Sequence, residues 1–330
     1  MSLDLDTVLD RRKLRRKLTF WRVAAVVIAL LAIGIGSFYL LGGSNMARTS
    51  SHIARLPIEG VILENRKQLQ LIESLGESES VKAVIVSINS PGGSTTGGEE
   101  LYNALRRLAE KKTVVAEIRT VGASAGYMVA LAGEHIFARY NSITGSIGVL
   151  FQYGNAAKLM NTIGVEMDAV KSAPLKAEPD FYSKASPEAR AVLKDVVDDS
   201  FDWFVSLVAE RRNLEPAAAK ALADGRIFSG HRAFENGLID SIGGEKEVVA
   251  WLTENKSVDA DLPVVTWELG RETDDLPFAL KMSKGLGSGV AETILEQSGV
   301  ANRLISPGFM LDGLVSVWQA SETEIDKRQY

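Results

Sequence analysis

The feature that most constrains the fold is an apolar, β-branched run at residues 81–88, which reads Val-Lys-Ala-Val-Ile-Val-Ser-Ile. A strand that is apolar along nearly its whole length is typical of a parallel sheet covered on both faces. A helical pattern with leucines on one face follows at about 98–111, and a second strand pattern occupies 113–118. Strands that alternate with helices predict βαβ units in a parallel or mixed sheet.

The remaining pattern extends this α/β plan over most of the chain. The polar, Pro-punctuated interval 171–186 predicts a loop. Further elements are expected as strands at 56–63, 136–138, 165–170 and 262–267, and as helices at 66–75, 187–212, 216–223 and 245–251.

The N-terminus predicts a membrane anchor. Val23 to Leu41 form a run of 19 residues without a charge, which is about the length needed to cross a bilayer. Six basic residues between 11 and 17 precede this run, so the N-terminus is expected on the cytoplasmic side. A cleaved signal peptide would have a shorter apolar region, roughly 7–15 residues long, and a small-residue cleavage site. The sequence therefore favours an uncleaved single-pass anchor over a signal peptide or a buried core helix.

These features predict the domain plan and exclude several classes of function. The net charge of −5 gives no reason to expect nucleic acid as a partner. The chain has no cysteine, which excludes disulfides, thiol catalysis and cysteine-ligated metals. The expected divisions are a basic cytoplasmic tail at 1–20, an anchor at 21–42, a linker at 43–54, a folded α/β domain at 55–255, and a C-terminal extension at 256–330 that contacts a subunit or the membrane.

Two residues form the most informative chemical pair. Ser124 lies among small residues in Thr120-Val-Gly-Ala-Ser-Ala-Gly-Tyr127, at the start of an expected helix. Lys176 follows in Lys171-Ser-Ala-Pro-Leu-Lys176, between apolar segments. A serine nucleophile needs a base, and a lysine can serve if burial favours its neutral form. The pair therefore indicates a Ser-Lys hydrolase, although either residue alone is more often structural or solvated.

Two further motifs complete an ordered set. Asn89-Ser-Pro-Gly-Gly-Ser94 follows the buried strand, and glycines there let backbone N–H groups face a ligand. Such donors can form an oxyanion hole, although an ordinary strand-to-helix turn explains the glycines equally well. Thr144-Gly-Ser-Ile-Gly-Val149 lies between the serine and the lysine. Together the motifs match the roles that acyl transfer requires.

In this order the motifs resemble the signal peptide peptidase A family of membrane-bound Ser-Lys peptidases, over roughly residues 56–252, in its short one-domain form. The resemblance implies an α/β spiral like that of Clp protease and crotonase, preceded by one transmembrane helix. It also implies Ser124 as nucleophile, Lys176 as general base, and Ser146 as the residue that orients the lysine. The backbone N–H groups of Gly93 and Ala125 are then the oxyanion donors.

The resemblance has wider implications. It implies a homo-oligomeric ring at the bacterial inner membrane, with the catalytic domain on the outer, periplasmic face. The substrates would be apolar peptides such as signal-peptide remnants, and no metal or cofactor would be needed. The chain departs from the family where Ala125 and Met128 follow the serine, and where Ala177 stands in place of an aspartate after the lysine. These changes concern substrate preference and loop geometry.

Other functions stay open from the residues alone. A crotonase-like acyl-CoA enzyme would share the glycine oxyanion logic but would have no use for the Ser-Lys pair. A regulatory protease or a non-catalytic oligomeric membrane scaffold would also suit an anchored α/β domain. The expected structural or surface residues are His52, His135, His231, Asp224 and Asp240.

Overall fold

The computed structural model describes residues 17, 20–28, 48–269 and 315–317. Residues 20–28 are helical, and most of the expected anchor lies outside the described residues. Within the part of the chain that the structure describes, no helix is both long enough and apolar enough to span a bilayer.

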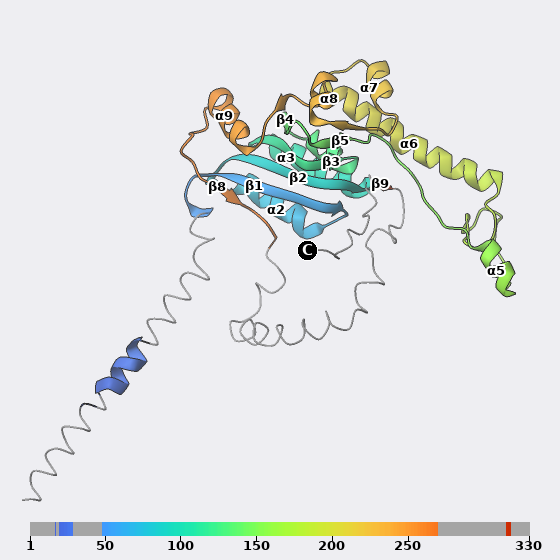
Figure 1. Ribbon diagram of the computed structural model, residues 1–330, viewed down its shortest axis with the longest axis horizontal. Coiled ribbons are helices and arrows are strands. Elements are labelled where there is room, and N and C mark those ends of the chain that lie inside the picture. The colour runs from blue at the N-terminus through green and yellow to red at the C-terminus, as the bar shows by residue number, and fades with distance from the viewer. Residues whose placement is uncertain (1–16, 18–19, 29–47, 270–314, 318–330) are drawn as a thin grey trace, which may run out of the picture. The chain divides into compact units, whose positions relative to one another are not determined.

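A mixed α/β sheet forms the body of the molecule (Figure 1). It contains nine strands among the described residues, and its main path runs β6-β5-β3-β2-β1-β8. The strands are β1 (His52–Ile62), β2 (Val81–Ser94), β3 (Thr113–Ala123), β4 (His135–Ala138), β5 (Ile143–Gly145), β6 (Ile227–Ser229), β7 (Ser241–Ile242), β8 (Val264–Thr266) and β9 (Val315–Val317).

Parallel pairing places several strand ends at one edge of the sheet. β2 pairs with β3 from Ala83↔Thr113 onward, and both β4 and β5 pair in parallel with β3. β5 lies beside the last residues of β3, with Ala123 opposite Gly145. The carboxyl ends of β2, β3 and β5 therefore lie together, which is where ligands bind in open α/β sheets.

The helices follow from local capping and apolar periodicity. They are α2 (Arg66–Glu77), α3 (Thr95–Ala109), α4 (Ala125–Ala130), α5 (Ala157–Ile163), α6 (Pro187–Arg212), α7 (Pro216–Leu222), α8 (Gly230–Glu235) and α9 (Glu245–Lys256). The Ser186 side chain caps α6 by accepting from the N–H of Ala189, and Pro187 suits its first turn. Asn213 ends the same helix in the left-handed conformation, which is typical of a C-terminal cap.

The main core lies between the sheet and helices α2, α3, α4 and the second half of α6. Its largest fully buried side chains include Tyr127, Phe204 and Leu105. The Tyr127 hydroxyl donates to the carbonyl oxygen of Leu238 at 2.7 Å, and burial raises the pKa of this phenol. Burial of this kind removes apolar surface from water and supplies most of the stability of such a body.

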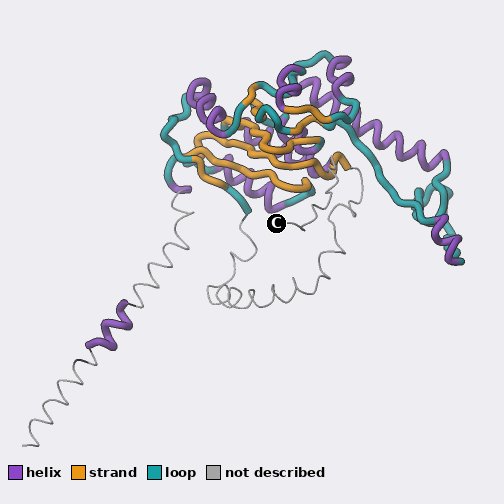
Figure 2. Tube along the Cα trace, viewed as in Figure 1, coloured by secondary structure: helices purple, strands orange, loops and turns teal. Residues whose placement is uncertain are grey.

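An arm extends from the body and is built from α5, the first half of α6 and the loops around them, shown as a right-hand projection in Figure 2. Val192 and Val196 on the first half of α6 are about half exposed, whereas Phe204 and Val208 on its second half are fully buried. Only the second half of α6 therefore packs on the body.

Three sequence predictions need correction. Residues 165–170 form no strand, because they lie in the arm, where no strand edge is available for pairing. The glycines at 92 and 93 lie in the last residues of β2 and not in a turn, since α3 begins directly after Ser94. β1 begins at His52, inside the residues expected as a linker, because β8 pairs in parallel with Ile53–Arg55.

Candidate active site

Ser124 stands at the junction between β3 and α4 in a strained conformation. Its backbone has φ 58° and ψ −120°, a combination that is costly for a residue with a Cβ. The side chain is buried, and it does not cap α4. The Ser124 N–H donates to the carbonyl oxygen of Gly145 at 2.8 Å, which fixes the serine against β5. Strain that the surrounding structure holds in place is characteristic of functional positions.

The end of β2 lies next to this serine. Gly93 is essential to the close approach of β1, because a Cβ at this position would lie 1.8 Å from the carbonyl oxygen of Ile62. A Cβ on Gly126, two residues after the serine, would lie 2.9 Å from the carbonyl oxygen of Ser90. The first turn of α4 therefore packs directly on the strand that carries Gly93.

Ser146 follows β5 and lies beside the serine in the fold. It too has a positive φ, of 51°, and is nearly buried. Its N–H donates to the carbonyl oxygen of Arg226 at 2.8 Å, so the residue directly before β6 holds it in place. The structure therefore brings Gly93, Ser124 and Ser146 to adjoining strand ends.

Ala125 is the first residue of α4 and is fully buried. Backbone N–H groups in the first turn of a helix are not used by the helix itself. The N–H of Ala125 thus suits the predicted role of a second oxyanion donor, next to the serine that would carry the acyl group.

Lys176 does not join this group within one chain. It belongs to the loop between α5 and α6, and this loop lies with α5 at the outer end of the arm that projects from the body (Figure 1). Its side chain is exposed, and its neighbour Leu175 is also 47% exposed. The sequence interpretation placed this lysine between apolar segments, and within a single chain its side chain is exposed.

Lys171 has a different environment on the same loop. Its Nζ lies 2.8 Å from Oε1 of Glu178 and 3.5 Å from Oδ2 of Asp180. The hydrogen bond to Glu178 raises the pKa of Lys171, so this lysine stays a cation and is a poor candidate for the base. Sequence reasoning missed the two carboxylates, although their positions seven and nine residues after Lys171 in a polar loop were a usable signal.

An extended chain lies against the glycine end of β2. Strand β9 pairs with it in antiparallel register, with Gly92 opposite Val317 and Ser94 opposite Val315. The edge that carries Gly93 therefore accepts a peptide backbone by strand addition.

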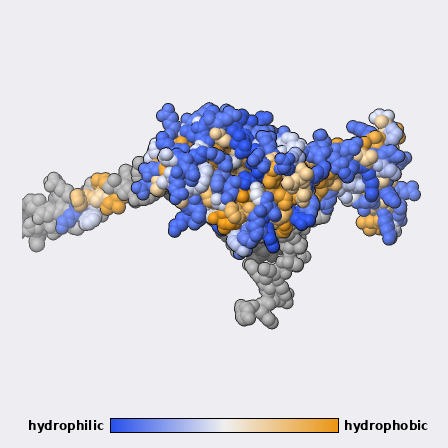
Figure 3. All heavy atoms as spheres, turned by 90° about the horizontal axis from the view of Figure 1, so that it is seen from above, coloured by the Kyte–Doolittle hydropathy of each residue, from blue (hydrophilic) through white to orange (hydrophobic). Residues whose placement is uncertain are grey.

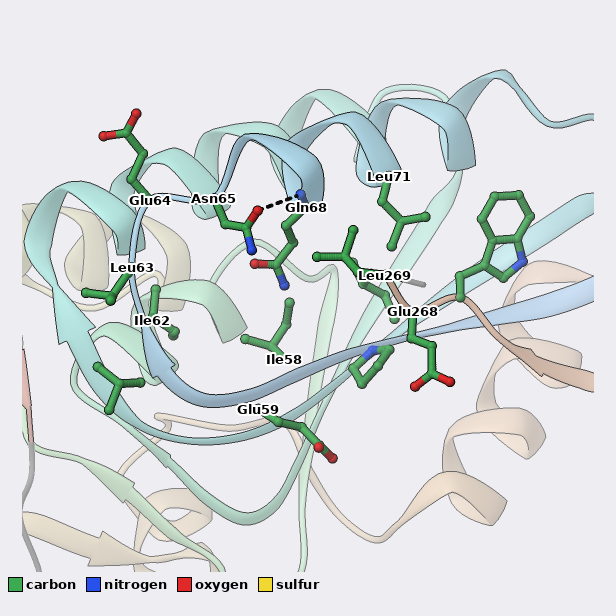
Figure 4. A pocket seen from close by; sticks show the side chains of 14 residues that line it. Ile58, Glu59, Ile62, Leu63, Glu64, Asn65, Gln68, Leu71, Glu268 and Leu269 are labelled. Atoms are coloured by element: carbon green, nitrogen blue, oxygen red, sulfur yellow. Dashed lines mark hydrogen bonds between the residues drawn. The ribbon is translucent and has the colours of Figure 1, made fainter. Parts of the chain in front are cut away.

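A groove lies beside the C-terminal half of β1 (Figure 4). Its volume is about 480 Å³, and β1, the start of α2 and residues 267–269 line it. The side chains of Ile58, Ile62 and Leu71 surround it, while the carboxylates of Glu59 and Glu64 point away from its centre. Ile62, which lines the groove, also has its backbone directly against Gly93 of β2.

The three histidines and the two aspartates all have local partners in the fold. His52 is buried and its Nδ1 lies 2.7 Å from the carbonyl oxygen of Ser50, while His135 packs between Phe137 and Trp251. His231 stacks on Tyr140. Asp224 pairs with Arg226 and Asp240 with Arg212. Among the described residues, no cluster of His, Asp and Glu could hold a metal ion.

Comparison with known proteins shows which proteins this chain is similar to. The family model described as "Peptidase family S49" matches residues 106–259. The model described as "Clp protease" matches residues 62–144, which supports a Clp protease-like α/β fold. A protein of Synechocystis sp. named as a protease is 34% identical over 78% of this chain and 91% of its own length. A protein of Enterococcus faecium named as signal peptide peptidase SppA is 30% identical over 78% of this chain and 77% of its own length. The chloroplastic serine protease SPPA of Arabidopsis thaliana is 29% identical over 83% of this chain and 40% of its own length.

Proposed function

The chain belongs to peptidase family S49 and is a serine peptidase, and from that premise we propose that it is a membrane-anchored endopeptidase with a Ser124–Lys176 dyad. Its substrates are apolar peptides such as signal-peptide remnants. The observation that carries the proposal is the strained, buried Ser124, which follows β3. Gly93 and Ser146 lie at the ends of the neighbouring strands β2 and β5.

The reaction is acyl transfer to the serine followed by hydrolysis. The neutral amine of Lys176 takes the proton of the Ser124 hydroxyl as the oxygen attacks the scissile carbonyl carbon. The N–H groups of Gly93 and Ala125 stabilise the oxyanion that forms. The lysine then gives its proton to the leaving amine, and water releases the acyl group by the reverse sequence. Ser146 orients the lysine by hydrogen bonding.

Two subunits are needed to assemble this dyad. Lys176 is exposed in a single chain, whereas a lysine that serves as a general base must be shielded from water. Docking of the arm on a neighbouring body would exclude water and favour the neutral amine. The exposed apolar side chains of the arm support such docking, and Figure 3 shows apolar surface at its outer end. They include Leu159, Ile163, Val165, Met167 and Val170. We therefore propose a homo-oligomeric ring in which each arm completes the site of its neighbour.

The surroundings of Gly93 suit an apolar peptide. The edge of β2 takes an extended backbone in antiparallel register, as its pairing with β9 illustrates. The groove beside Ile62 offers apolar side chains to a substrate residue. An acyl-CoA substrate has no use for a strand edge, so this geometry favours a peptide.

Placement at a membrane completes the proposal. The uncharged run at 23–41 and the basic residues before it support a single-pass anchor at 21–42, with the N-terminus in the cytoplasm. The peptidase domain then lies on the periplasmic face of the bacterial inner membrane. Anchoring raises the local concentration of apolar peptides released in or near the bilayer.

The test compares the detergent-solubilised protein with Ser124→Ala and Lys176→Ala on casein and on a synthetic apolar signal peptide. Both substitutions should lower kcat/KM by roughly 10³-fold or more, because the two residues act as a unit. Lys184→Ala is the matched control, since it removes another exposed lysine of the arm. Near-normal cleavage by Lys176→Ala would refute the base assignment. Retained cleavage by Ser124→Ala would refute the nucleophile.

A further inference from the structure

The loop that carries Lys176 is closed by partly buried charge. The side chain of Lys171 is 21% exposed, and those of its partners Glu178 and Asp180 are 15% and 9% exposed. This is unusual for an arm whose other residues are mostly exposed, since charged side chains are rarely shielded unless they are paired. The titratable groups that act on Lys171 are Glu178, Asp180 and the Tyr182 phenol. Paired charges shielded in this way point to a role other than keeping the surface of the arm soluble.

Backbone hydrogen bonds also hold the same loop on both sides of Lys176. The Lys176 N–H donates to the carbonyl oxygen of Ala173 at 3.0 Å, and the Glu178 N–H donates to that of Leu175 at 3.4 Å. Ala177 adopts a positive φ of 60°, which a residue with a Cβ adopts only when its surroundings enforce it. These contacts restrain the backbone on both sides of Lys176.

The base of the loop is tied off by further hydrogen bonds. Oδ1 of Asp180 accepts the N–H groups of Tyr182 and Ser183 at 3.1 and 2.6 Å. Across the arm, the Ala156 N–H donates to the carbonyl oxygen of Phe181 at 2.6 Å. Asp180 thus binds both Lys171 and the backbone at residues 182 and 183. Lys171 is the cation that pairs with both carboxylates of the loop.

We propose that Lys171 is a positioning residue for the reaction of Lys176: its ion pairs with Glu178 and Asp180 close the loop and keep both carboxylates engaged. The inference rests on the proposed function, in which Lys176 is the base. A carboxylate released beside Lys176 would favour its protonated form and withhold it from the serine. Lys171 therefore fixes the position of the loop that carries Lys176. It also neutralises Glu178 and Asp180, the acidic residues that follow Lys176 most closely in the sequence.

The test substitutes Lys171→Met in the full-length protein, with Lys171→Arg as the conservative variant. The methionine should lower kcat/KM on the apolar peptide by roughly 10–100-fold, because small misplacements of a catalytic group are costly. It should also move the rise of the pH–activity profile to higher pH, whereas arginine should restore much of both. Adding Glu178→Gln and Asp180→Asn to Lys171→Met should move the profile back toward lower pH.

A second readout does not depend on activity. Hydrogen exchange of the backbone amides at 172–183 should become faster in Lys171→Met and stay unchanged in the control Lys194→Met, which breaks an exposed pair with Asp198 on α6. Unchanged exchange together with an unchanged pH profile in Lys171→Met would overturn the inference. If Ser124→Ala or Lys176→Ala proves active, the proposed function fails, and the exchange rates still decide whether Lys171 closes the loop.

Discussion

At the scale of single residues, the site depends on backbone positions that tolerate little change. Gly93 has no space for a side chain because the Ile62 carbonyl oxygen occupies that position. Ser124 and Ser146 hold positive φ values that most residues avoid. In the proposed mechanism these three positions supply the nucleophile, an oxyanion donor and the orienting hydroxyl, so conservative substitutions there should be more harmful than burial alone suggests.

Substitution of Gly93→Ala should separate β1 from β2. The added Cβ would meet Ile62 backbone atoms at 1.8 to 2.6 Å, so the strand must move. We expect the free energy of unfolding to fall by about 3 kcal/mol and peptidase activity to be lost. Urea denaturation of both proteins measures the first effect. Gly154→Ala is the control, since a Cβ there meets nothing within 4 Å. Equal stability of all three proteins would contradict the structure at β2.

The Asp240–Arg212 pair ties the end of α6 to β4, and its contribution should depend on pH. Burial would raise the pKa of Asp240, but hydrogen bonds and charge from Arg212 and the Ile136 N–H outweigh it, so the pKa is lowered. A carboxylate whose pKa is lowered by folding stabilises the fold above its unfolded pKa of about 3.9. That stability is lost as the pH falls through the folded value.

Asp240→Asn should therefore lower the free energy of unfolding by about 3 kcal/mol at pH 7, because Arg212 is left without its anion. The difference from the unmodified protein should shrink as the pH falls below about 4. Denaturation series at pH 7 and pH 3 measure this. Asp198→Asn, in an exposed pair, should cost less than about 1 kcal/mol at either pH. A difference for Asp240→Asn that is constant with pH would contradict the assignment.

At the scale of elements, sequence periodicity predicted much of the body. The apolar run at 81–88 and the leucine pattern after it became β2 and α3, and the pattern at 187–212 became α6 with the same bounds. In these elements the spacing of the apolar residues alone predicts the type of element and its buried face. The short β5 and β6 were not predicted, because three-residue strands carry too little periodicity and depend on partners far away in the chain.

The groove beside β1 gives a prediction at this scale. Leu63 is 49% exposed and lines the groove, so Leu63→Gln should leave the fold intact. We expect KM for an apolar peptide to rise several-fold with little change in kcat, since the lost contact is made equally in ground and transition states. Ile242→Gln, at an exposed position on β7, should leave KM unchanged. A fall in kcat alone would argue against a substrate-binding role.

At the scale of the whole molecule, the least predictable feature was the arm. The sequence indicated a polar loop at 171–186 and a long helix after it, and both are present. Nothing in a single sequence says that the first half of that helix leaves the body, because an apolar stripe looks the same whether its partner is the same chain or another subunit. The separation of Ser124 from Lys176 follows from this one departure, and it makes assembly a condition of the proposed activity.

Subunit exchange tests that condition directly. Ser124→Ala retains a working arm and Lys176→Ala retains a working serine, so each should be inactive alone. Mixed under conditions that let subunits exchange, they should recover activity wherever a Lys176 arm reaches an intact Ser124. With random mixing in equal amounts, about one interface in four combines both functional residues. The mixture should therefore reach roughly a quarter of the normal rate. A double variant carrying both substitutions, mixed with either single variant, is the control and should restore nothing. Persistent inactivity of the mixture, with exchange shown by labelled subunits, would mean that each chain must supply both residues itself. The arm would then have to fold back onto its own body.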